Sequence, residues 1–77
     1  MTSTYQLIAV LTDPRTPLNS FSYIADGDEV VVVELIKPQP VRYKPYRITA
    51  TQEAQIQVQK AERLGWEVTW AEGQEPA

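Results

Sequence analysis

The residues best suited to contact a ligand lie between positions 41 and 47, where basic and aromatic side chains are interleaved as Val-Arg-Tyr-Lys-Pro-Tyr-Arg. Rings can stack on nucleobases and cations can contact phosphates, so this pattern is typical of surfaces for single-stranded nucleic acid. The same stretch can form a basic rim that docks an acidic protein, or an edge strand guarded by charges and proline. The candidate binding residues are Arg42, Tyr43, Lys44, Tyr46 and Arg47.

The formal net charge of the chain is −3, which opposes non-specific binding to nucleic acid or anionic lipid. A protein partner is therefore the main hypothesis, and single-stranded nucleic acid is the alternative.

Two apolar residues are further candidates for partner contact. Ile56 falls on the polar side of a predicted helix, and Trp70 ends a predicted strand, where a tryptophan can anchor an interface.

Catalysis is poorly supported because the chain has no histidine, which is the commonest general base in enzymes. It also has no cysteine, so it has no thiolate to bind a metal. Its serines lack a Gly-x-Ser-x-Gly context, and three glycines form no phosphate-binding loop. Asp26, Asp28 and Glu29 carry carboxylates that suit a hard cation, but Asp26-Gly27 is also a strong hairpin signal. We favour the turn, and we expect no enzyme activity, metal or cofactor.

One helix and one strand are predicted over residues 49–70. Thr49 and Gln52 fit a capping box, and Gly65 suits the end of a helix. Beyond Gly65, the alternation from Trp66 to Trp70 is typical of a half-buried strand. The predicted buried stripe of the helix, at helical spacing, consists of Ala50, Ala54, Val58, Ala61 and Leu64.

Four further strands are predicted at residues 4–12, 20–25, 29–36 and 41–48, with a proline-containing loop at 13–19. A type I′ turn is expected at Asp26-Gly27. The predicted fold is α+β, with a four- to five-stranded, mainly antiparallel sheet and one helix on one face, in the order β-β-β-β-α-β. Residues 1–70 form a single domain, and residues 71–77 form a disordered acidic tail.

Apolar residues on two faces of the sheet pose a covering problem. One helix covers one face only, so the other face requires curling of the sheet or a second chain. We expect contact with another protein or with a second copy as a homodimer. The residues assigned to this second face are Ile8, Val10, Val31, Val33 and Leu35.

Residues 57–70, preceded by Pro45-Tyr46, loosely resemble the end of the small linker domain that caps phycobilisome rods. This resemblance implies a colourless structural linker. The residues themselves indicate a small, non-enzymatic protein-interaction module, such as an accessory subunit or a phage- or host-encoded regulator. The short apolar run at 7–11 indicates neither a signal peptide nor a membrane span, so a soluble cytoplasmic protein is expected.

Overall fold

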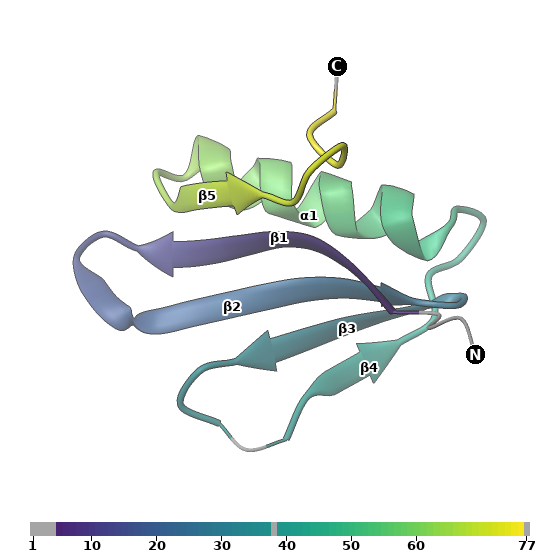
Figure 1. Ribbon diagram of the computed structural model, residues 1–77, viewed down its shortest axis with the longest axis horizontal. Coiled ribbons are helices and arrows are strands. Elements are labelled where there is room, and N and C mark those ends of the chain that lie inside the picture. The colour runs from purple at the N-terminus through teal and green to yellow at the C-terminus, as the bar shows by residue number, and fades with distance from the viewer. Residues whose placement is uncertain (1–4, 38, 77) are drawn as a thin grey trace.

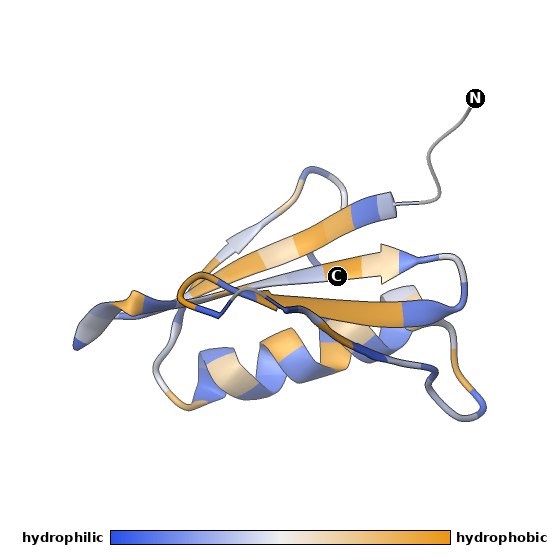
Figure 2. Ribbon diagram, turned by 90° about the horizontal axis from the view of Figure 1, so that it is seen from below, coloured by the Kyte–Doolittle hydropathy of each residue, from blue (hydrophilic) through white to orange (hydrophobic). Residues whose placement is uncertain are grey.

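The computed structural model describes residues 5–37 and 39–76, and it confirms the predicted α+β fold and element order. A five-stranded antiparallel sheet carries one helix on one face, as Figures 1 and 2 show. The strand order is β4-β3-β2-β1-β5, so β2 is central. The elements are β1 (Tyr5–Asp13), β2 (Thr16–Asp26), β3 (Glu29–Glu34), β4 (Val41–Tyr43), α1 (Ala50–Arg63) and β5 (Glu67–Trp70). Thr4, the predicted start of β1, lies outside the described residues.

A β-bulge at Ile8 changes which residues of β1 face the helix. Leu7 pairs with Ile24 and Ala9 pairs with Tyr23, so Ile8 is the extra residue between two pairs. A bulge of this kind turns neighbouring side chains toward the same side of the sheet. Ile8 and Ala9 are both fully buried in the cluster that includes the helix. The assignment of Ile8 to the second face was therefore wrong, whereas Val10 remains there opposite Ser22.

The loop predicted at 13–19 is shorter in the structure, because β2 already begins at Thr16. Asp13 pairs with Thr16, and Asp13 Oδ1 accepts a hydrogen bond from the Arg15 amide at 3.0 Å. Pro14 occupies the turn itself, where its missing amide donor costs nothing. The proline signal therefore marks a tight turn between two long strands.

The turn between β2 and β3 differs in type from the predicted one. Asp26 pairs with Glu29, so Gly27 and Asp28 are the central residues. Gly27 has φ +60°, whereas Asp28 is not among the described residues with positive φ. Positive φ at the first central position alone is the pattern of a type II′ turn. The prediction of a hairpin at this glycine is confirmed, but the type I′ assignment was wrong.

The helix begins and ends through local hydrogen bonds. Thr49 Oγ1 accepts from the Gln52 amide, and Gln52 Oε1 accepts from the Thr49 amide, each at 3.1 Å, which confirms the capping box. At the other end, the Trp66 amide donates to Ala61 O and the Gly65 amide donates to Glu62 O, each at 3.1 Å. With Gly65 at φ +96°, this is a Schellman motif.

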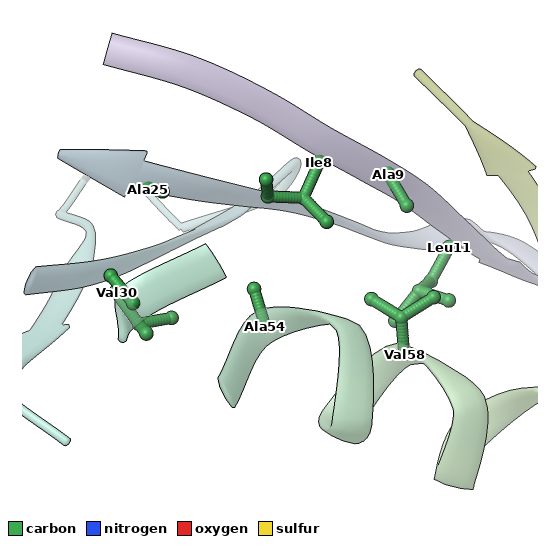
Figure 3. Close-up of a cluster of buried hydrophobic side chains, with 8 residues drawn as sticks. Ile8, Ala9, Leu11, Ala25, Val30, Ala54 and Val58 are labelled. Atoms are coloured by element: carbon green, nitrogen blue, oxygen red, sulfur yellow. The ribbon is translucent and has the colours of Figure 1, made fainter. Parts of the chain in front are cut away.

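The core lies between α1 and the sheet, and Figure 3 shows Leu11 and Val58 meeting across it. Ala50, Ala54 and Val58 are buried as predicted, and their small size lets the helix approach the strands closely. Leu64 is 78% exposed, so its assignment to the buried stripe was wrong. The Schellman motif ends the helix there and leaves this side chain beyond the sheet contact. The buried cluster is Ile8, Ala9, Leu11, Ala25, Val30, Ala50, Ala54 and Val58.

Two predicted strands are shorter in the structure. β3 ends at Glu34, and β4 contains only Val41–Tyr43 instead of residues 41–48. Pro45 removes an amide donor and Arg47 has φ +67°, so the chain leaves the sheet before the helix. In the C-terminal segment, the Ala71 amide donates to Ile8 O and Gln55 Nε2 donates to Gln74 O, each at 2.9 Å. The predicted disorder of 71–77 stays a prediction, and Ala77 lies outside the described residues.

Candidate functional site

An apolar groove of about 390 Å³ lies beside the C-terminal half of α1, and we call it the helix-flank groove. Strands β1, β2 and β3 form its floor, and the helix forms one wall. Phe21 and Trp66 meet in the groove with their ring centroids 5.5 Å apart. The lining residues are Leu11, Phe21, Tyr23, Val32, Gln57, Lys60, Ala61, Leu64 and Trp66.

The groove exists because one helix is narrower than a five-stranded sheet. Strands lie about 4.8 Å apart, so five of them span about twice the roughly 10 Å diameter of a helix. The helix packs against β1, β2, β3 and β5, and its backbone stays further from β4. Phe21, Tyr23 and Val32 are therefore only half-buried although they share the helix side of the sheet. The part of this face beside the helix therefore stays partly open to solvent.

A hydrogen bond between Tyr43 and Glu53 closes the sheet-to-helix gap near the start of the helix. The Tyr43 hydroxyl donates to Glu53 Oε2 at 3.0 Å and so joins β4 to α1. Burial, this hydrogen bond and the nearby negative charge of Glu53 raise the pKa of Tyr43 to about 12. Burial and then the charge of Glu53 also raise the pKa of Tyr23 above its ordinary value. Both phenols are therefore protonated at neutral pH.

The groove is mostly apolar, and few of its lining residues can ionise. Among its lining residues, only Tyr23 and Lys60 can ionise, and the raised pKa of Tyr23 keeps its phenol protonated at neutral pH. Gln57 is the other polar lining residue, and it interrupts the apolar stripe of the helix. Lys60 is exposed and has no ion pair within 4.0 Å in the part of the chain that the structure describes. The site thus offers an apolar surface with a free positive charge at its rim.

The basic-aromatic stretch does not form one surface. Arg42 lies on the sheet face opposite the helix, where Nη1 is 2.8 Å from Asp26 Oδ2 and 3.8 Å from Glu29 Oε1. Its Nη2 also donates to the Tyr5 hydroxyl at 3.1 Å. Tyr43, the next residue, points to the helix side. Alternation along β4 therefore separates these two candidates to opposite faces of the sheet.

The other candidates of the stretch lie in the connection from β4 to α1. Lys44 Nζ is 3.1 Å from Asp28 Oδ2, which places both exposed charges at the β2–β3 turn. Tyr46 is 82% exposed, and the Arg47 guanidinium lies 5.1 Å from the centre of its ring. This cation–π pair is the only part of the predicted binding stretch that presents an aromatic ring to solvent. The carboxylates of Asp26, Asp28 and Glu29 are all engaged with Arg42 or Lys44.

Neither Ile56 nor Trp70 lines the helix-flank groove. Ile56 is exposed on α1, and Lys60 and Leu64 follow it at four-residue spacing along one flank of the helix. At about 100° per residue, Ile56 lies about 160° around the helix axis from the buried Val58, so it faces away from the sheet. Trp70 lies on β5 opposite Ala9 and packs half-buried against the core. Its indole nitrogen is buried without a hydrogen-bond partner among the described residues.

Comparisons of the chain with protein-family models, with curated proteins and with solved structures find no match, so none supports the resemblance to the phycobilisome linker family. Within residues 5–37 and 39–76, the only helix is too short and too polar to cross a bilayer. No group of three metal-binding side chains occurs in the same residues.

Sequence reasoning did not identify the groove itself. Phe21, Tyr23 and Val32 were assigned to strands without indicating that the helix leaves them partly uncovered. Leu64 was placed in the core, and Trp66 was predicted only as part of a half-buried strand. Gln57 carried the useful signal, because a polar residue within an apolar stripe indicates that part of the stripe meets solvent.

Proposed function

We propose that this chain is a small, non-enzymatic protein-binding module that holds an apolar, acid-flanked segment of another protein in the helix-flank groove. The carrying observation is the groove itself, with its aromatic walls and exposed Leu64. Large apolar residues exposed next to a concave surface are typical of interaction sites. An accessory subunit or a regulator is the role that suits such a module.

Charge at the rim supports an acidic flank on the partner segment. Lys60 lines the groove, and Arg63 follows three residues later on the exposed surface of α1. Neither side chain forms an ion pair within 4.0 Å in the described residues. Complementary charges at a rim steer association and select among partners, and they add little affinity. The apolar side chains of the partner segment therefore supply most of the binding free energy. Lys60 and Arg63 supply the preference for an acidic segment.

The number of apolar side chains that the groove can hold limits its affinity for a partner segment. Burial of one large apolar side chain contributes about 1.5–3 kcal/mol, and association carries an entropic cost. Two or three anchors in the groove therefore contribute about 3–9 kcal/mol before that cost is subtracted, which supports binding in the millimolar to high-micromolar range. Higher affinity requires further contacts outside the groove.

Selection of peptides from a random displayed library against the intact folded chain tests the proposal. We expect the selected peptides to carry clustered apolar residues with nearby Asp or Glu. Leu64→Glu should weaken their binding about tenfold or more, equivalent to about 1.4 kcal/mol. Leu7→Glu is the matched control, because Leu7 is also an exposed apolar residue but lies on the opposite face of the sheet.

Two outcomes would contradict the proposal. One is a set of peptides that bind Leu64→Glu as well as the unchanged chain. The other is binding to a polyanion that weakens steeply with added salt and depends on Arg47, which would favour nucleic acid.

Lys60→Glu should reduce the preference for acidic peptides while leaving binding of neutral apolar peptides largely intact.

A further inference from the structure

We infer that the partner segment held in the helix-flank groove continues past Leu64 into a second hollow, where Arg15 binds the carboxylate of an aspartate or glutamate on that segment. The inference rests on the proposed function, and it assigns the acid-binding position of the same site. The second hollow has a volume of about 230 Å³, and we call it the turn hollow. Its lining residues are Asp13, Pro14, Arg15, Leu64, Gly65 and Trp66.

The turn hollow adjoins the helix-flank groove, because Leu64 and Trp66 line both. It lies where the turn between β1 and β2 meets the turn between α1 and β5, and Figure 1 shows both turns at the same end of the molecule. Leu64 is 78% exposed and contributes to the walls of both hollows. A chain that lies over Leu64 therefore reaches the groove on one side and the turn hollow on the other.

An extended partner segment has the spacing that two adjacent hollows require. Its residues rise about 3.3 Å each, and alternate side chains point to the same side about 6.6 Å apart. The two hollows are separated by the side chain of one leucine. Apolar residues at alternate positions can therefore occupy the groove, and the next alternate residue enters the turn hollow.

The guanidinium of Arg15 is available to an acidic side chain. Its Nε lies 3.7 Å from Asp13 Oδ1, which is longer than a hydrogen bond, and that oxygen already accepts from the Arg15 amide at 3.0 Å. The Arg15 side chain is 87% exposed, and its terminal nitrogens form no hydrogen bond within residues 5–37 and 39–76. These two nitrogens match the two oxygens of a carboxylate in a forked contact.

The charges around the two hollows favour an acidic residue on the segment. Among the described residues that line them, Asp13 carries the only carboxylate, and its side chain is only 15% exposed. Lys60 adds a second positive charge on the groove side. The joined hollows thus present two accessible cations on a chain whose net charge is −3. Complementary charge of this kind selects among partners, whereas a basic segment would meet repulsion from both cations.

NMR titration of the intact chain with short synthetic peptides tests the inference. Each peptide carries leucine at two alternate positions and glutamate, glutamine or lysine at the next alternate position, either before or after the leucines. The better glutamate peptide should bind about twofold to fivefold more tightly than its glutamine twin, which is the range of an exposed ion pair. Both should shift the amide signal of Leu64, whereas only the glutamate peptide should shift the Nε–H signal of Arg15.

Substitution of Arg15 should remove the preference for glutamate. In Arg15→Glu, the lysine peptide should bind more tightly than the glutamate peptide. Arg15→Gln provides a second variant that places no further carboxylate beside Asp13, in case Arg15→Glu disturbs the turn. Arg47→Glu is the matched control, because it makes the same change of charge in the connection from β4 to α1, at the other end of the helix. The amide spectrum checks that each variant is folded.

Equal binding of the glutamate and glutamine peptides would overturn the inference. So would a preference for glutamate that persists in folded Arg15→Gln, or one that Arg47→Glu removes equally, since the effect would then be one of overall charge. The proposed function would survive these results if Leu64→Glu still weakened binding of the glutamine peptide. Absence of binding by every peptide at millimolar concentration would overturn this inference together with the proposed function.

Discussion

The Arg42 guanidinium on β4 donates a hydrogen bond to the Tyr5 hydroxyl on β1 at 3.1 Å, although β3 and β2 lie between these two strands. The side chain reaches across the sheet face opposite the helix and meets Asp26 on its way, with Nη1 2.8 Å from Oδ2. Val31 is buried beneath this arrangement, on a face that no other element of the described residues covers. Arg42 therefore holds the edge strand through charge, hydrogen bonding and the packing of its aliphatic stem.

Replacement of Arg42 tests this bridging role. Arg42→Ala should lower the melting temperature measurably, because it exposes Val31 and removes one ion pair of Asp26. Arg42→Lys should recover only part of the loss, because an ammonium group cannot reproduce the forked contact with Asp26 and Tyr5. Lys44→Ala is the control: its ion pair with Asp28 is exposed on both sides and should matter little. Equal melting temperatures for Arg42→Ala and Lys44→Ala would contradict the bridging role.

The hydrogen bond from Tyr43 to Glu53 predicts a loss of stability at alkaline pH. The pKa of Tyr43 is about 12 in the folded chain, compared with about 10 for an ordinary tyrosine. The folded state therefore holds the proton more tightly, so the stabilisation is complete below about pH 10 and is lost as the pH rises through about 12. Tyr23 contributes in the same direction.

Titration of tyrosinate absorbance measures this effect directly. The difference between the unchanged chain and Tyr43→Phe should show a transition near pH 12. Glu53→Gln should move the Tyr43 transition toward lower pH, because it removes the negative charge but retains an acceptor. A Tyr43 transition near pH 10 in the folded chain would show that β4 is not held against the helix.

Local sequence signals predicted the ends of the helix well, because each signal depends on only a few neighbouring residues. The capping box at Thr49 and Gln52 and the glycine at position 65 gave the ends of the helix, and both are confirmed by hydrogen bonds. The bulge at Ile8 was not predictable from alternation. Residues 7–11 are all apolar, so the sequence does not indicate which of these side chains face the helix and which face the other side of the sheet. The bulge is defined by the pairing of β1 with β2, which the alternation of β1 alone does not specify.

The groove was not predictable for a different reason. Its existence depends on how far the helix sits from the β4 edge, which is a property of tertiary packing. The residues of the basic-aromatic stretch likewise look contiguous in the sequence. Strand alternation and the turn at Arg47 send Arg42, Tyr43 and Tyr46 to three different environments. Composition therefore identified suitable side chains but not their separation onto different surfaces.

The turn at Gly27 gives a prediction that separates two turn types. Gly27→Ala should lower the free energy of unfolding by about 1–2 kcal/mol, since φ +60° is disfavoured for any residue with a Cβ. Gly27→Val should cost more because of its branched side chain. Asp28→Gly should bring no gain, because only the first central residue of a type II′ turn has positive φ. Stabilisation by Asp28→Gly in urea unfolding would instead indicate type I′.

The position of Leu64 gives the last prediction, which also bears on the groove. Leu64 and Val58 both lie on the sheet-facing half of the helical projection, but Leu64 is 78% exposed and Val58 is fully buried. Leu64→Ala should therefore change the free energy of unfolding by less than about 1 kcal/mol. Val58→Ala should lower it by about 2–3 kcal/mol, because it removes buried methyl groups and leaves a cavity between α1 and β1.

Urea unfolding of both variants decides the comparison, and unchanged m values would show that the same surface is exposed on unfolding. If Leu64→Ala costs as much as Val58→Ala, the last turn of the helix packs on the sheet in solution. The groove beside it would then be closed, and the proposed binding of an apolar segment would fail with it. If only Val58→Ala is costly, Leu64 is free to contact a partner, because its apolar surface is not used to stabilise the fold.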